Sequence, residues 1–375
     1  MTETNPTMTA DNYYIPFTWE KMLSQNPPRE YNIEEYYKIL SPDFPEFLKK
    51  YIELPLLQRL KGIGLLCGTD WTKLYRNRFY YSRLDHSIGV ALIIWHFTHD
   101  KAQSIAGLLH DVSTPVFSHV SDFRKGDALT QTATEAPNET MIRRDKALLL
   151  LLQQDGLKVD DVVDYHKYPV ADNEIPQLSA DRLEYMYPSG MALDGSWTME
   201  EIARTYNDLE VLKNEDDEDE LGFNTLAVAE EYCHHFCMIG HILQLNENKL
   251  SLHMLGQIMN KAVTLGILTE KDFYAKSETE IIEQIEKSPQ NTGYFARLYK
   301  TFRTMESIEH TAFPLPEDEY FCINLKVKQR FINPLVRDKK TGRSRRLSEL
   351  SSSSRKIIED FKTFSDTAYG CVKLV

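Results

Sequence analysis

The sequence predicts a mainly α-helical protein with a small β-containing appendage at its C-terminal end. Through most of the 375 residues, apolar side chains recur at three- and four-residue spacing, which is typical of helices with one buried face. Between residues 320 and 336 the composition shifts to β-forming residues, and 323–328 alternate between apolar and polar side chains as in a strand.

Four regions follow from this pattern. Residues 1–32 are rich in Pro, Asn and Thr, and we expect them to form a poorly ordered lead-in. Residues 33–200 are expected to form a helical core that contains the reactive groups, and 201–315 a helical extension packed on this core. Residues 316–375 are expected to form the appendage of strand and helix.

The clearest single element is a helix over residues 88–97, with His86 on its apolar face. The apolar segment 102–109 is expected to end at His110-Asp111, with Pro115 interrupting the chain soon after, and the helix 180–187 is expected to stop at Pro188. In both places proline removes an N–H donor and disfavours helix in the residue before it. The acidic run 214–220 is expected to be an exposed loop. Helices are predicted at 88–97, 102–109, 144–154, 180–187, 226–245, 249–268 and 347–361, followed by a closing strand.

The composition limits the classes of partner. There are 56 Asp and Glu residues against 43 Lys and Arg, a formal net charge of -13, which argues against broad binding to nucleic acid or anionic membranes. A local basic pocket for an anionic substrate is still compatible with this balance. The five widely spaced cysteines predict reduced thiols and no disulfide framework. The sequence contains neither a signal-peptide pattern nor an apolar run of membrane-spanning length, so we expect a cytoplasmic protein without a membrane partner.

Three separated segments contain residues that can bind a metal together. Two imidazoles and two carboxylates supply nitrogen and oxygen ligands to a divalent cation, and a six-coordinate ion would keep positions for water and substrate. Each piece alone also fits a hydrogen-bonded core histidine or a chance dipeptide, but their order in apolar helical surroundings favours a metal site. The segments are 83–90, 107–119 and 179–185, and the candidate ligands are His86, His110, Asp111 and Asp181.

The order of His, then His-Asp, then Asp resembles the HD-domain metal-dependent phosphohydrolases. The surroundings are most similar to the branch that contains the deoxynucleoside triphosphate triphosphohydrolases. The resemblance implies an HD-domain helical core, one divalent metal ion (Fe, Mn, Ni, Zn or Mg), a small phosphorylated substrate, with a nucleotide favoured, and a homo-oligomer. The similar segments are 54–60, 83–90 and 107–119, and more loosely 331–335 and 346–350.

The resemblance also implies roles for residues around the metal. Arg83, Arg182 and Tyr185 match positions that bind substrate, although a salt bridge for Arg83 and a core position for Tyr185 are the ordinary alternatives. His119 and Asp122 match positions near the family's active site, but either could instead brace the loop. The candidate proton donors are His119, Asp122 and Glu139.

Two departures from the family pattern leave the function open. Thr114 stands where the family usually has a histidine three residues after the metal-binding Asp, and Asn138 replaces another histidine before Glu139. The favoured function is hydrolysis of a phosphate ester by metal-activated water attacking phosphorus. The alternatives are a catalytically degenerate HD protein that serves as a metal- and nucleotide-binding sensor or scaffold, and hydrolysis of another phosphoester such as a cyclic nucleotide.

Two further clusters have ordinary explanations. Residues 233–237, with His241 nearby, contain Cys and His at a spacing that fits an amphipathic helix better than a zinc site. The basic run 337–346 is expected to be a solvated hairpin. An anion or regulatory-nucleotide site at a subunit interface is the alternative for that run.

Overall fold

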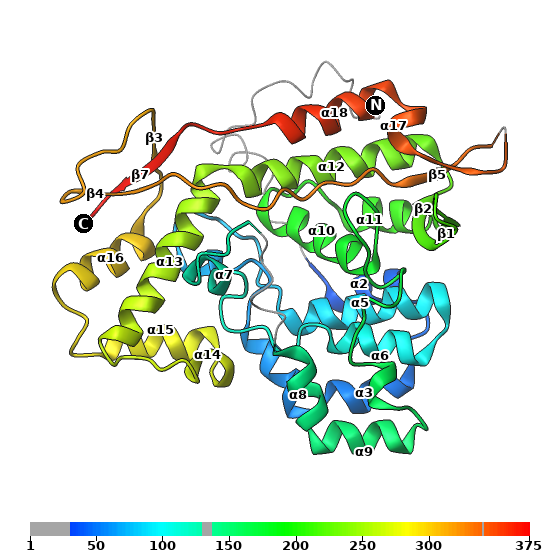
Figure 1. Cartoon of the computed structure of the whole chain (residues 1–375), viewed down its shortest axis with the longest axis horizontal. Coiled ribbons are helices and arrows are strands. Elements are labelled where there is room, and N and C mark those ends of the chain that lie inside the picture. The colour runs from blue at the N-terminus through cyan, green and yellow to red at the C-terminus, as the bar shows by residue number, and fades with distance from the viewer. Residues whose placement is uncertain (1–30, 130–136, 340) are drawn as a thin grey trace, which may run out of the picture.

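The computed structural model describes residues 31–129, 137–339 and 341–375, so the lead-in predicted for 1–32 lies almost wholly outside the described residues. Most of the described chain is helical, as predicted (Figure 1). The α-helices are α2 (Ile33–Leu40), α3 (Glu46–Ile52), α4 (Pro55–Gln58), α5 (Arg83–Thr98), α6 (Lys101–Leu109), α7 (Val120–Arg124), α8 (Asn138–Arg144), α9 (Lys146–Gln154), α10 (Ala180–Leu193), α11 (Met199–Tyr206), α12 (Leu226–Gln244), α13 (Asn246–Thr264), α14 (Asp272–Ala275), α15 (Glu278–Lys287), α16 (Gly293–Thr304), α17 (Leu347–Leu350) and α18 (Ser352–Thr363). The strands are β1 (Leu209–Lys213), β2 (Asp219–Phe223), β3 (Glu309–Thr311), β4 (Tyr320–Ile323), β5 (Leu335–Arg337), β6 (Ser344–Arg346) and β7 (Tyr369–Lys373).

Helix α5 lies at the centre of the core, where it packs against α6 and α10. Its start is defined by a capping box, in which the Ser82 hydroxyl accepts from the Asp85 N–H and the Asp85 carboxylate accepts from Ser82. Ser179 caps α10 in a similar way by accepting from the Arg182 N–H. The caps matter for function because the first turn of α5 contains His86, and the first turn of α10 contains Asp181.

Helix α10 continues past Pro188 to Leu193, so the end predicted at Pro188 is wrong. Proline has no N–H to donate to the carbonyl of Glu184, four residues earlier. The hydroxyl of Tyr36 lies 3.5 Å from that carbonyl and offers a replacement donor. The second half of the helix is buried, and tertiary packing therefore outweighs the local cost of proline.

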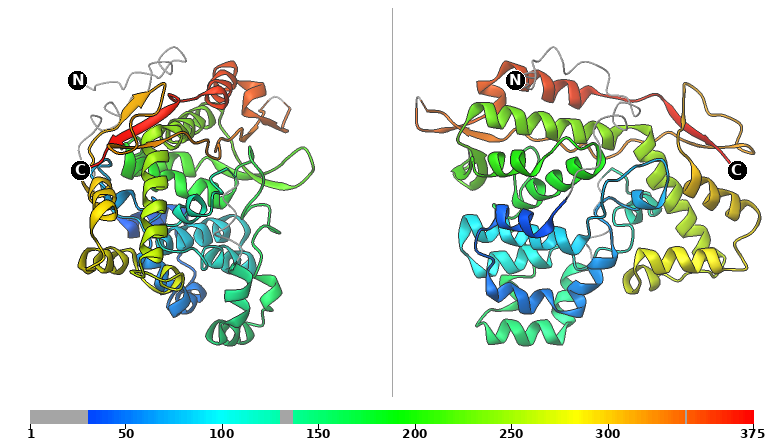
Figure 2. Two further views of the ribbon diagram at one scale, coloured as in Figure 1. Left: turned by 60° about the vertical axis from the view of Figure 1, so that its left-hand side comes forward. Right: turned by 180° about the vertical axis from the view of Figure 1, so that it is seen from behind.

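Helices α12 and α13 confirm the two long helices predicted at 226–245 and 249–268. Leu245 separates them, and the chain changes direction there, so that α13 runs away from α12 and packs against α7 and α16 (Figure 1). Helix α18 lies beside α12 in each view of the molecule (Figures 1 and 2).

The strands form two sheets, ordered β1-β2-β5-β6 and β3-β7-β4. The region 201–315 therefore contributes β1, β2 and β3 besides its helices. The strand predicted from the alternation at 323–328 ends already at Ile323, and an irregular segment leads on to β5. The predicted closing strand is confirmed as β7.

The acidic run and the basic run are partners in the first sheet. β5 and β6 form the hairpin predicted for 337–346, but Arg346 is mostly buried and binds Glu220 at 2.7 Å and Glu215 at 2.6 Å. The expectation of a wholly exposed acidic loop is corrected here, because Glu220 is buried in β2. A parallel pairing between β2 and β5 brings the two runs together.

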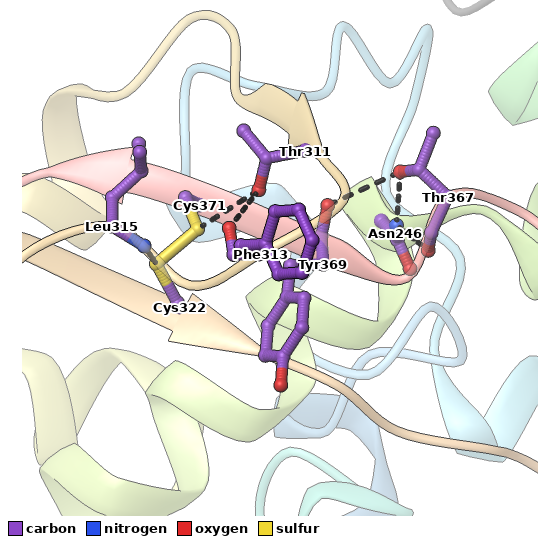
Figure 3. Close-up of a disulfide and its surroundings, with 8 residues drawn as sticks. All are labelled: Asn246, Thr311, Phe313, Leu315, Cys322, Thr367, Tyr369 and Cys371. Atoms are coloured by element: carbon purple, nitrogen blue, oxygen red, sulfur yellow. Dashed lines mark hydrogen bonds between the residues drawn. A yellow bond between two sulfur atoms is a disulfide. The ribbon is translucent and has the colours of Figure 1, made fainter.

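Cys322 and Cys371 form a disulfide, which corrects the expectation that all five cysteines are reduced thiols (Figure 3). The two residues lie directly opposite each other in the antiparallel strands β4 and β7. The two cysteines are 49 residues apart in the sequence, and they meet only because of the register between their strands. The amino-acid composition does not specify that register. Cys67, Cys233 and Cys237 are free thiols.

No helix in the described part of the chain is both long enough and apolar enough to cross a membrane.

Candidate metal centre

His86, His110 and Asp181 converge on one point, with their ligand atoms all within 4.8 Å of one another. The Asp181 Oδ1 atom lies 3.0 Å from Nε2 of His86 and 3.7 Å from Nε2 of His110. The three residues come from the first turn of α5, the residue after α6 and the first turn of α10. The structure thus brings together residues that the sequence separates by as many as 95 positions, the distance from His86 to Asp181.

Asp111 lies at the edge of this group. Its Oδ2 atom is 3.6 Å from Nε2 of His110 and 3.9 Å from Nε2 of His86. The same atom accepts a hydrogen bond from Arg83 at 2.8 Å, and Oδ1 accepts one from the Thr114 hydroxyl at 2.7 Å. Thr114 therefore orients the Asp111 carboxylate.

The charges of the cluster fit a cation. Burial lowers the pKa of His86, but the carboxylates of Glu184 and Asp181 outweigh burial and raise this pKa to about 10. Burial raises the pKa of Asp181, but the hydrogen bond from His86 and the charge of His110 hold it well below its usual range. Two imidazoles and two carboxylates form a mixed nitrogen and oxygen set that suits a divalent transition metal.

Glu184, which the sequence analysis did not single out, orients the ring of His86. Its Oε2 atom bonds Nδ1 of His86, and its Oε1 atom accepts from Tyr81 at 2.6 Å and from Tyr36 at 3.1 Å. With Nδ1 bonded in this way, Nε2 of His86 is left for the cluster. The sequence feature that could have identified Glu184 is its position three residues after Asp181, which places both side chains on one face of the same helix.

His110 is oriented by the backbone. Its Nδ1 atom bonds the carbonyl oxygen of Gly107 at 2.6 Å, so that Nε2 is the nitrogen that faces Asp181. The ring of His110 also lies 5.0 Å from the ring of Tyr165, centroid to centroid. Both imidazoles are thus held with the same nitrogen toward the carboxylate of α10.

A cavity of about 180 Å³ adjoins the cluster. Of the predicted residues around the metal, Arg83, His119 and Tyr185 line it. The sequence analysis missed other polar lining residues, among them Lys328 and Arg330 from the segment between β4 and β5. Apolar residues also line the cavity, among them Leu65, Leu66, Ile242, Leu243, Leu252 and Val327.

His119 and Asp122 form a pair at the cavity wall. Nδ1 of His119 lies 2.9 Å from Oδ2 of Asp122, whose side chain is fully buried. Burial lowers the pKa of His119, although Asp122 opposes this shift. The pair therefore presents a neutral imidazole that Asp122 orients.

Two predicted residues lie away from the cavity. The guanidinium of Arg182 turns back to the preceding loop, where it donates to Oδ1 of Asn173 at 2.7 Å. Glu139 is exposed on α8 and pairs with Arg143 at 2.7 Å. Neither residue lines the cavity, so the structure supports no contact of either with a substrate bound there.

A second group of potential ligands in the described chain consists of Glu247, His310 and Asp366. Nε2 of His310 lies 2.9 Å from Glu247, and Nδ1 lies 3.3 Å from Asp366. Since both ring nitrogens already have partners, this group serves as a link that holds β3 and the residues before β7 against α13. On α12, burial lowers the pKa of His234, His235 and His241, in agreement with an amphipathic helix.

Comparison with known proteins gives relatives that match part of the chain. The chain is 31% identical over 142 residues to the uncharacterized protein YdhJ of Bacillus subtilis. This match covers 37% of the chain and 41% of that protein. It is 26% identical over 153 residues to the metal-dependent phosphohydrolase cns2 of Cordyceps militaris, covering 41% and 43% respectively. The chain thus spans less than half the length of these curated relatives. No protein-family model matches it.

Two solved structures share the fold over most of the chain. A phosphohydrolase from Bacteroides thetaiotaomicron has a TM-score of 0.60 at 14% identity, covering 89% of this chain and 97% of that one. A hypothetical protein from Aquifex aeolicus also has a TM-score of 0.60 at 14% identity, covering 88% and 92%. At such low identity these likenesses show the fold.

Proposed function

We propose that this protein is a metal-dependent phosphohydrolase that hydrolyses a phosphate ester, with a nucleotide as substrate. The observation that supports this most is the convergence of His86, His110 and Asp181 beside a cavity with basic side chains. The name of the fungal relative agrees with a metal-dependent hydrolase. The motif resemblance to the triphosphohydrolase branch favours a nucleotide.

The chain's own residues can supply the other parts of the reaction. When bound, a divalent metal supplies Lewis acidity that polarises phosphate oxygens and activates water. Arg83 holds Asp111 in place and adds positive charge beside the phosphate. As the oxygen of water bonds to phosphorus and the phosphorus–oxygen bond to the leaving group breaks, the leaving oxygen needs a proton. The attacking water must also lose a proton, and Nε2 of His119, which is unprotonated while Nδ1–H is held by Asp122, can accept that proton and pass it to the leaving oxygen.

The test is to replace Asp181 with Ala and to measure metal content together with phosphate release from mono-, di-, tri- and cyclic nucleotides. Asp181→Ala removes the proposed metal ligand that lies close to both imidazoles. We therefore expect loss of the metal and a drop in the hydrolysis rate of more than about 100-fold. Asp216→Ala is the matched control, because this exposed carboxylate lies on the turn between β1 and β2. Hydrolysis retained in Asp181→Ala would place the chemistry elsewhere.

One observation favours a second candidate function. Thr114 stands where the resembling family usually has a histidine, and its hydroxyl is engaged with Asp111. A protein that binds metal and nucleotide without turnover would retain stoichiometric metal, lose it in Asp181→Ala, and release no phosphate from any member of the panel. That result would support a sensor or scaffold and reject the enzyme.

A further inference from the structure

We propose that Glu247, His310 and Asp366 form a second metal site, which binds a divalent ion such as Zn²⁺ or Mn²⁺ and fastens the sheet β3-β7-β4 to α13. The three residues lie in the first turn of α13, in β3 and in the segment between α18 and β7. One ligand atom from each residue lies within 4.8 Å of the other two. None of the three lines the cavity beside His86, so this site does not rest on the proposed function.

The contacts of Thr367 determine which nitrogen of His310 can bind a metal. The Thr367 hydroxyl donates to the carbonyl of Tyr369 at 3.1 Å and accepts from the Asn246 amide at 3.0 Å (Figure 3). Because its hydrogen is used on Tyr369, this hydroxyl can only accept from Nδ1 of His310, which lies 3.1 Å away. The hydrogen of the imidazole is therefore on Nδ1, and Nε2 is the nitrogen available to a metal.

A cation is needed between Nε2 of His310 and Glu247. Nε2 lies 2.9 Å from Oε1 of Glu247. At this distance a nitrogen lone pair and a carboxylate oxygen repel each other, so that either a proton or a metal ion has to lie between them. Metal bonds of about 2.1 Å, at angles of about 90° to 110°, separate two ligand atoms by about 3.0 to 3.4 Å, which is close to the observed 2.9 Å.

The second oxygen of Glu247 favours the metal ion over the proton. Glu247 is 4% exposed, and its Oε2 atom has no hydrogen-bond partner among the described residues. A buried carboxylate oxygen without a partner is costly. A proton on Nε2 of His310 would bond only to Oε1, whereas a metal ion can bind both oxygens of one carboxylate.

Asp366 is held in place beside these two residues. Its Oδ2 atom accepts from the N–H of Asn246 at 2.7 Å, and its Oδ1 atom accepts from the N–H of Thr367 at 2.6 Å. Each carboxylate oxygen has a second lone pair, so Asp366 can also bind a metal. The two acids outweigh the charge of Lys249, whose pKa is lowered by burial although both acids oppose this shift. The local negative charge attracts a cation, which can enter from solvent because His310 is partly exposed.

The donor set indicates the class of ion and its role. One imidazole with two carboxylates suits Zn²⁺ or Mn²⁺ better than Mg²⁺, which prefers oxygen ligands alone. Asn248, the residue after Glu247, lines the cavity and accepts from the Tyr75 hydroxyl at 3.1 Å. A metal bound at Glu247 would therefore stabilise the part of α13 that contributes to the cavity wall.

The test compares Glu247→Gln and His310→Gln with their parent, both in the wild type and in Asp181→Ala. Each protein is stripped with a chelator and titrated with Zn²⁺ or Mn²⁺ by calorimetry. In both backgrounds we expect each substitution to remove one equivalent of bound metal, with affinity at that site at least about 100-fold lower. Glu309→Gln is the matched control, because this exposed carboxylate is the neighbour of His310 in β3 and does not belong to the cluster.

Stability without metal separates the loss of a ligand from the loss of the fold. Glutamine keeps the size of Glu247 and removes a buried charge, so metal-free Glu247→Gln should melt at the temperature of its parent or above it. Zn²⁺ should raise the melting temperature of the parent more than that of the variant. An unchanged number of equivalents in both Glu247→Gln and His310→Gln would overturn the inference, as would an equal loss in Glu309→Gln.

The two metal proposals fail separately. If the wild type hydrolyses no nucleotide while Glu247→Gln still removes one equivalent, the enzyme proposal fails and the second site stands. If Asp181→Ala alone removes all bound metal together with hydrolysis, the enzyme proposal stands and the second site fails.

Discussion

At the scale of single residues, the candidate metal centre depends on a carboxylate that would not touch the metal. Glu184 is fully buried, and its two oxygens accept from Tyr36, Tyr81 and the His86 ring. A buried carboxylate is costly unless each oxygen is hydrogen-bonded, and these donors meet that requirement. In return, Glu184 fixes which nitrogen of His86 carries the proton.

We predict that Glu184→Gln lowers metal affinity by about 10- to 100-fold. Glutamine keeps the size of the side chain, but its amide has only one acceptor oxygen, and the other position becomes an NH2 group. Where that NH2 group faces His86, Nδ1 of His86 must become an acceptor. The proton then moves to Nε2, which can no longer bind a metal. Metal titration of the metal-free protein measures the effect. Tyr36→Phe is the control, because it removes one donor and leaves the carboxylate; an equal loss in that variant would contradict this explanation.

The sequence could predict those residues that lie in short contiguous patterns. His86, His110, Asp111 and Asp181 each stand in a motif, and the structure brings all four together. Lys328 could not be predicted, because its relation to the cavity depends on backbone contacts with Ala128 and Gln244, which are distant in the chain. Such contacts exist only in the folded molecule.

At the scale of elements, α5 and α10 approach closely because α5 has a glycine at the contact. A Cβ atom at Gly89 would lie 2.7 Å from Cγ and 2.8 Å from Cδ of Glu184, well inside van der Waals contact. Glu184 in turn cannot retreat, because it is held by Tyr36, Tyr81 and His86. The glycine is thus needed for the helices to position His86 against Glu184.

We predict that Gly89→Ala lowers the free energy of unfolding by about 1 to 3 kcal/mol and weakens metal binding, since the added methyl group must displace Glu184. Gly256→Ala, in the middle of α13, is the matched control. Its added Cβ would lie 3.4 Å from Cγ of Arg124, an ordinary contact, so helix propensity should raise stability by about 0.5 to 1 kcal/mol. Urea unfolding of the two variants measures both effects, and a stabilised Gly89→Ala protein would show that the helices are not closely fitted here.

Periodicity predicted the existence of the helices better than their ends. The apolar spacing in α12 and α13 is a local property, and both helices were predictable within a few residues. The continuation of α10 through Pro188 was not predictable, because it depends on burial and on Tyr36, which is distant in sequence. The local free-energy cost of proline predicted the wrong end for α10, because tertiary packing determines where this helix ends.

At the scale of the whole molecule, contacts between residues far apart in the sequence hold the parts of the protein together. β2 pairs with β5 across more than 100 residues, and β4 with β7 through a disulfide. These pairings explain why the acidic and basic runs and the cysteines were misread from sequence, since each has its partner elsewhere in the chain. The mainly helical class needed no such information and was predictable.

Glu278 is a further link of this kind, and it leads to a prediction on pH. It is the first residue of α15 and is 1% exposed, and it accepts from the N–H of Gly64 at 2.9 Å and from the Trp71 indole at 2.8 Å. The carbonyl of Gly64 in turn accepts from Ser118, which also accepts from Arg83. Glu278 thus connects the helical extension to the wall of the cavity.

Burial raises the pKa of Glu278 from 4.5 to about 7, although both hydrogen bonds oppose the shift. In the unfolded chain this carboxyl ionises near pH 4.5, whereas in the folded chain it stays protonated to higher pH. Its contribution to stability is therefore fully present below pH 4.5 and is lost as the pH rises to about 7, by about 3 kcal/mol in total.

Glu278→Gln isolates this effect, because glutamine is neutral and similar in size at every pH. We expect the free energy of unfolding of the wild type, relative to this variant, to fall by about 3 kcal/mol between pH 4.5 and 8. Chemical unfolding of both proteins at several pH values measures the difference, and other titrating groups cancel because both chains contain them. A difference that stays constant across this range would mean that Glu278 is already ionised in the folded protein at low pH, and that its buried charge is stabilised by Gly64 and Trp71.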